Sequence, residues 1–113
     1  MGFINRLFGG KAGAPPAELL GCWQLVPSRS DAEPAEAEFR DDGRLFYSVL
    51  SDGRWQIMKL RYEVDGQILV TDQASAPRKE RTAFSLGSDG TLTLELGGER
   101  SVFKRGPKVA PVG

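Results

Sequence analysis

Two carboxylates are the residues of this chain best spaced for chemistry. Glu36 and Glu38 lie two positions apart in a segment that we expect to be a strand, and such neighbours share one face of a sheet. A pair of carboxyl groups on one face could act as a general acid and a general base. Glu33 extends the same acidic run, however, and we expect a solvated acidic strip on an edge or outer surface.

Other catalytic groups are scarce. The chain has no histidine, which removes the commonest metal ligand and excludes Ser-His-Asp and Cys-His mechanisms within one chain. Cys22 is the single cysteine, so no internal disulfide can form, and no cationic neighbour is predicted that would activate its thiol. We therefore expect a non-enzyme without metal or cofactor.

Aromatic residues of the predicted strands form the candidate ligand-binding set. Inward rings with one or two hydroxyl groups suit a small apolar ligand, which Tyr47 and Tyr62 would orient. The same rings could simply fill the core, because an eight-stranded barrel has room for its side chains or for one small ligand. The set consists of Phe39, Tyr47, Trp55, Tyr62, Phe84 and Phe103.

The elements that must position these residues are short antiparallel strands. Four Asp-Gly pairs and Gly97-Gly98 are mostly separated by about one strand, and such pairs supply the positive φ angles of tight hairpin turns. The one long gap, from Gly66 to Asp89, contains a loop at Pro77 that divides it into two strands. The Asp-Gly pairs lack the Asp-x-Asp-x-Asp-Gly spacing of a calcium loop. Their punctuation predicts eight strands, at residues 20–27, 35–41, 44–50, 54–64, 67–73, 80–87, 91–96 and 100–105.

These strands predict an all-β, antiparallel, up-and-down barrel. Closure of the first strand on the last would remove both sheet edges, and a two-layer sandwich is the structural rival. Leu92 and Leu94 alternate with threonines as a half-buried strand requires. Trp55 and Ile57 have the opposite parity to the apolar residues that follow them, which indicates a bulge or sharp coil near Ile57.

The chain divides into an N-terminal arm and linker (1–18), the barrel (19–105) and a flexible tail (106–113) that we expect to fray. The arm would form a short amphipathic helix, too short to be stable alone. It would need the barrel mouth, a second subunit or a membrane surface to pack against, with the membrane ranked last. The arm residues that would make this contact are Phe3, Ile4, Leu7 and Phe8.

Composition limits the partners and the compartment. Fifteen basic and fifteen acidic residues give a net charge of zero, which offers no electrostatic reason to expect nucleic acid. The N-terminal apolar cluster is too short and too polar for a secretory signal, so we expect a soluble, cytoplasmic protein. The charge run at residues 78–81 could bind an anion but is more typical of a solvated loop.

The segment Gly21-Cys22-Trp23 resembles the Gly-x-Trp opening of the first strand in lipocalin-like (calycin) barrels. The stretches 38–43, 62–69 and 89–94, which lead toward Phe103 and Arg105, are also similar to small bacterial lipocalin-like domains. The resemblance covers residues 19–105, although this chain is shorter than a secreted lipocalin and has no disulfide pair.

The resemblance implies structural roles for three residues. Gly21 and Trp23 would open the first strand, with the indole across the barrel base and Arg105 over its ring. It also implies a non-catalytic barrel that binds a small apolar ligand in its interior. The alternative is a module for protein interaction or self-association that uses the N-terminal arm and has no small-molecule ligand.

Overall fold

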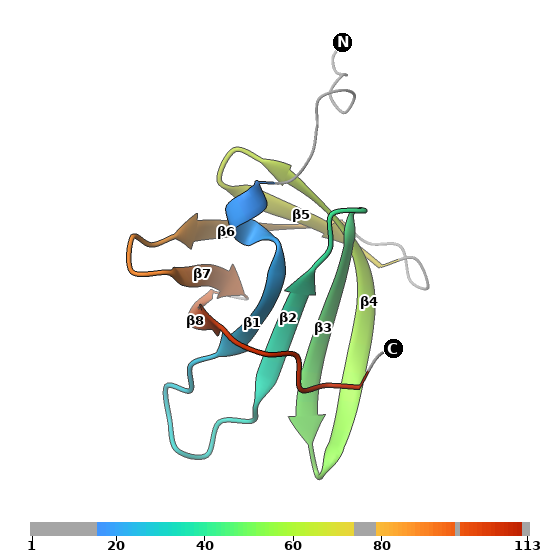
Figure 1. Cartoon of the computed structure of the whole chain (residues 1–113), viewed down its shortest axis with the longest axis vertical. Coiled ribbons are helices and arrows are strands. Elements are labelled where there is room, and N and C mark those ends of the chain that lie inside the picture. The colour runs from blue at the N-terminus through green and yellow to red at the C-terminus, as the bar shows by residue number, and fades with distance from the viewer. Residues whose placement is uncertain (1–15, 74–78, 97, 112–113) are drawn as a thin grey trace.

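The computed structural model describes residues 16–73, 79–96 and 98–111, and these form a closed antiparallel barrel (Figure 1). Each strand pairs with the next along the chain, and the last pairs with the first. The elements are a 3-10 turn η1 (Ala17–Leu19) and the strands β1 (Gly21–Leu25), β2 (Ala35–Phe39), β3 (Arg44–Ser51), β4 (Arg54–Asp65), β5 (Ile68–Asp72), β6 (Glu80–Leu86), β7 (Thr91–Leu96) and β8 (Glu99–Arg105).

Closure of the barrel joins β1 to β8. Trp23 lies opposite Arg105, and Leu25 lies opposite Phe103, in an antiparallel register. The predicted barrel is confirmed and the two-layer sandwich is excluded. The Asp-Gly turns also behave as predicted, since Asp52 and Gly53 both have positive φ, at 53° and 73°. A two-residue hairpin turn of this type has the twist of the strands that it joins.

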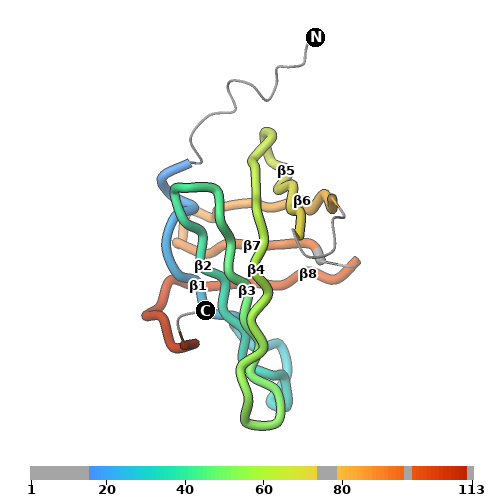
Figure 2. Tube along the Cα trace, turned by 90° about the vertical axis from the view of Figure 1, so that its right-hand side faces the viewer, coloured from blue at the N-terminus to red at the C-terminus, as the bar shows by residue number. Residues whose placement is uncertain are grey.

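The bulge predicted near Ile57 is wrong. The register between β3 and β4 runs without interruption from the Arg44–Arg61 pair to the Ser51–Arg54 pair. Within the described residues, β5 pairs with the second half of β4, from Arg61 to Asp65. The first half belongs to a β3–β4 hairpin that reaches past its neighbours (Figure 2), where Trp55 lies opposite Leu50 and Ile57 lies opposite Ser48.

The core fills the barrel from the η1 end. Leu19 and Phe103 are completely buried, and the Phe39 and Tyr62 rings meet edge to face with centroids 5.2 Å apart. This packed cluster consists of Leu19, Trp23, Ala37, Phe39, Leu45, Tyr62, Leu69, Phe84, Leu92, Leu94 and Phe103.

The two ends of the chain differ in what the structure describes. The predicted arm residues, and with them the predicted N-terminal helix, lie outside the described residues; η1 is the helical element that the structure does describe. No helix in the described part of the chain has the length and apolar character needed to cross a membrane. At the other end, residues 106–111 cross the outer face of β1–β3 (Figure 1), where we had expected a fraying tail.

Candidate functional site

An open pocket of about 1100 Å³ occupies the end of the barrel opposite η1. The β1–β2 connection, the inner face of β3 and the start of β8 form its walls. Its apolar surface comes from Leu25, Val26, Pro27, Ala32, Ala35, Tyr47, Val49 and Val102. We call this hollow the mouth pocket. Small side chains at Ala35 and Ser101 help to leave it unfilled.

Tyr47 gives the mouth pocket an accessible hydroxyl group. The ring packs against the core, and burial raises the pKa of Tyr47 above its ordinary value, so the hydroxyl stays protonated at neutral pH. Among the described residues, this hydroxyl has no hydrogen-bond partner. The other tyrosine differs, because the Tyr62 hydroxyl donates to the carbonyl oxygen of Arg40 at 2.7 Å. Tyr47 is thus the tyrosine whose hydroxyl is free for a ligand.

The rim of the mouth pocket is polar and carries both signs of charge. Arg29 and Asp31 form an ion pair at 3.3 Å, with both side chains largely exposed. The Ser51 hydroxyl donates to Glu33 at 2.9 Å, and Arg100 lies 3.6 Å from Glu95. Five charged residues line the pocket, and three of them are acidic (Asp31, Glu33 and Glu99), so the lining carries a small net negative charge.

The six predicted ligand-binding aromatics do not come together around one cavity. Phe39, Tyr62, Phe84 and Phe103 are members of the packed core. Trp55 lies opposite Leu50 near the tip of the β3–β4 hairpin and is half-buried. Of the six, only Tyr47 lines the mouth pocket.

The predicted structural residues meet at the η1 end. The Arg105 guanidinium carbon lies 4.2 Å from the centroid of the Trp23 ring, and the indole N–H donates to the carbonyl of Leu19 at 2.9 Å. Gly21 has a φ of +110°, and a Cβ at this position would lie 2.6 Å from Nη1 of Arg105. The glycine therefore lets the guanidinium approach the backbone.

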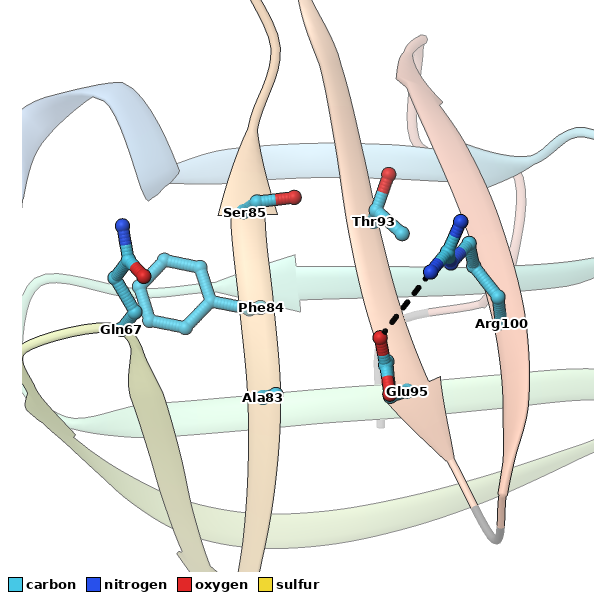
Figure 3. A pocket seen from close by; sticks show the side chains of 7 residues that line it. All are labelled: Gln67, Ala83, Phe84, Ser85, Thr93, Glu95 and Arg100. Atoms are coloured by element: carbon cyan, nitrogen blue, oxygen red, sulfur yellow. Dashed lines mark ion pairs between the residues drawn. The ribbon is translucent and has the colours of Figure 1, made fainter.

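A second, smaller pocket of about 400 Å³ lies beside β6, β7 and β8 (Figure 3). Glu95 and Arg100 point toward one another across it, with Ser85 and Thr93 nearby and Phe84 beneath Gln67. The two charged residues of its lining are paired with one another at 3.6 Å. It offers a ligand less apolar surface than the mouth pocket does.

The acidic strip predicted at Glu36 and Glu38 is not solvated. Both carboxylates lie on the outer face and Lys108 reaches both, at 3.4 Å and 3.1 Å, but Glu36 is completely buried. It accepts hydrogen bonds from Gln24 and from the N–H of Val109, each at 2.8 Å. The prediction of a solvated acidic strip was wrong because residues 106–111 cover this face. The sequence near Glu36 does not indicate a contact with so distant a segment.

Electrostatics at Glu36 favours the charged form. Burial alone would raise the pKa of Glu36, but the N–H groups of Val109 and Ala110, the Gln24 amide and the Lys108 charge outweigh it and lower that pKa. The adjacent Cys22 behaves in the opposite way. Burial, followed by the charge of Glu36, raises the pKa of its thiol to about 11, which leaves it a poor nucleophile at neutral pH.

Two further candidates can be placed. In the described part of the charge run, Arg81 lies 3.5 Å from Asp65, and Lys79 and Glu80 have interactions of their own; Arg78 lies outside the described residues. Within the described ranges, no cluster of three or more Cys, Asp or Glu side chains could hold a metal ion. The sequence matches no protein-family model and no curated protein, and the closed eight-stranded barrel is compatible with a lipocalin-like fold.

Proposed function

We propose that this chain is a non-catalytic, lipocalin-like barrel that binds a small, mostly apolar molecule in the mouth pocket. The observation that carries the proposal is the Tyr47 hydroxyl, which lies at the pocket without a partner among the described residues, while the only other tyrosine is satisfied. A hydroxyl that is accessible from a pocket and has no partner in the protein can bond a ligand there.

The size and lining of the pocket define the ligand class. A hollow of about 1100 Å³ slightly exceeds the usual range for small-molecule sites, which is roughly 300–1,000 Å³. Its apolar wall of Leu25, Val49 and Val102 would cover rings or short alkyl chains. The ligand would place one hydrogen-bond acceptor against Tyr47, and its polar end would face the mixed charges of the rim.

Titration with the apolar fluorophore 1-anilinonaphthalene-8-sulfonate tests the proposal. We expect saturable binding of one molecule to the native chain. Ser101→Trp, which fills the pocket, would weaken binding at least tenfold. The matched control is Ala83→Trp, which places the same ring at the second pocket and leaves binding unchanged. Equal binding by both variants would refute a mouth-pocket site.

A further inference from the structure

The C-terminal segment 106–111 lies on the barrel as a bound peptide would. Its main chain is recognised at three points: the Pro107 carbonyl accepts from the Gln24 amide at 2.6 Å, and the N–H groups of Val109 and Ala110 donate to Glu36 at 2.8 Å and 3.2 Å. Backbone contacts of this kind can be made by many extended peptides.

The side chain of Lys108 makes specific ionic contacts with the barrel. The Lys108 ammonium lies between two carboxylates, 3.4 Å from Glu36 and 3.1 Å from Glu38. Glu36 is completely buried, so its charge needs a cationic partner more than an exposed carboxylate would. We call Gln24, Glu36, Glu38 and Ser48 the Glu36 site.

The segment fits the Glu36 site incompletely. Val109 is 60% exposed, and the apolar side chain of the segment that is buried is the small one of Ala110. Ser48 lies directly opposite Glu36 in the β2–β3 register and is completely buried, yet its hydroxyl has no hydrogen-bond partner among the described residues. An unpaired buried hydroxyl costs free energy, which a better ligand would recover.

We propose that the Glu36 site is a recognition site for an extended, lysine-bearing peptide of another protein, and that residues 106–111 occupy it as an intramolecular competitor. The partner would present its lysine to Glu36 and Glu38 and a polar group to Ser48. This inference is independent of the mouth pocket, because the Glu36 site lies on the outer face of the barrel.

The first test measures how firmly Glu36 holds the segment in the full chain. Trypsin can cut after Lys108 only when this stretch leaves the barrel. We expect Glu36→Gln to accelerate cleavage of the Lys108–Val109 bond at least tenfold. Glu33→Gln, the same change at an exposed acid outside the site, should cleave at the rate of the unaltered chain. Equal rates for all three proteins would overturn the proposal.

The second test asks whether the site takes a peptide from outside. The probe is a fluorescently labelled peptide with the sequence of residues 106–113, and the readout is its anisotropy. Lys108→Gln weakens the internal competitor and leaves the site intact, so this variant should bind the probe at least fivefold more tightly than the unaltered chain. Lys59→Gln, an exposed lysine outside the site, is the matched control and should bind as the unaltered chain does.

Three results would contradict the proposal. The first is an absence of probe binding to Lys108→Gln at millimolar concentration, with its circular dichroism unchanged. The second is equal affinity for a probe in which glutamine replaces the lysine. The third is a concentration-dependent dimer of the unaltered chain that trypsin cleavage dissolves, which would assign the site to the C-terminal segment of a second copy instead.

Discussion

The guanidinium of Arg105 covers the ring of Trp23 at 4.2 Å from its centroid and also donates to the backbone carbonyls of Leu20 and Glu18. One side chain of the last strand therefore holds both the first strand and the turn that precedes it. Since Trp23 also bonds Leu19, this end of the barrel is closed by a connected set of contacts.

Replacement of Arg105 should loosen that closed end. A partly solvated cation over an indole contributes about 1 kcal/mol, so we expect Arg105→Ala to lower the free energy of unfolding by about 1–2 kcal/mol once the carbonyl contacts are lost too. Urea unfolding measures the change. Arg105→Lys keeps a charge near the ring but lacks the planar fork, and its stability should fall in between. An alanine variant as stable as the unaltered chain would refute the role.

Gly21 should tolerate no side chain. Its φ of +110° is unfavourable for other residues, and a Cβ would press on Nη1 of Arg105. We expect Gly21→Ala to lower the free energy of unfolding by more than about 1 kcal/mol. Gly66→Ala is the matched control, because Gly66 also has a positive φ but has nothing within 4 Å of a Cβ. The Gly21 variant should be the less stable one; the reverse order would contradict the close approach.

Tyr62 should make the fold sensitive to alkali. Burial, followed by the charges of Asp42 and Asp41, raises the pKa of Tyr62 from 10.0 to about 12. The Tyr62 hydroxyl of the unfolded chain ionises near pH 10, whereas that of the folded chain stays protonated up to about pH 12. The contribution of Tyr62 to the free energy of unfolding is therefore complete below pH 10 and is lost as the pH rises to about 12. Urea unfolding from pH 8 to 11.5 measures the loss. Tyr62→Phe should reduce this slope, and an undiminished slope would contradict the assignment.

Cys22 should react slowly with alkylating agents. Burial and the nearby Glu36 charge raise its thiol pKa from 9.0 to about 11, so the thiolate fraction at pH 8 is roughly a hundredfold below that of an ordinary thiol. We expect alkylation by iodoacetamide to be at least tenfold slower than for the urea-unfolded chain, and to accelerate up to about pH 11. A rate equal to that of the unfolded chain at pH 8 would show that the thiol is not perturbed.

Sequence reasoning succeeded where the signal is local. The Asp52-Gly53 turn and the alternation of Leu92 and Leu94 each depend on neighbours within a few positions, and together such signals predicted the order of the strands. Closure followed from the cost of free sheet edges. The contact between Trp23 and Arg105 was implied by the resemblance to lipocalin-like barrels, and the structure places the two residues opposite one another.

The parts that escaped prediction depend on contacts between distant segments. The sequence around Glu36 predicts a solvated carboxylate. In the structure, Lys108 and Ala110, which lie more than 70 positions later, contact it. Tyr62 belongs to the packed core and Tyr47 lines the mouth pocket, and the sequence does not show which end of the barrel is packed and which is open. The sequence also does not show that Trp55 lies near the tip of the β3–β4 hairpin, opposite Leu50, and away from the mouth pocket.

Tyrosine carbon resonances test the mouth pocket most directly, because Tyr47 and Tyr62 are the only tyrosines of the chain. With both rings labelled with ¹³C and assigned through Tyr47→Phe, we would titrate the chain with 1-anilinonaphthalene-8-sulfonate to saturation. The account predicts that the Tyr47 signal shifts while the Tyr62 signal stays in place. Saturable binding that moves Tyr62 and leaves Tyr47 unchanged would contradict it.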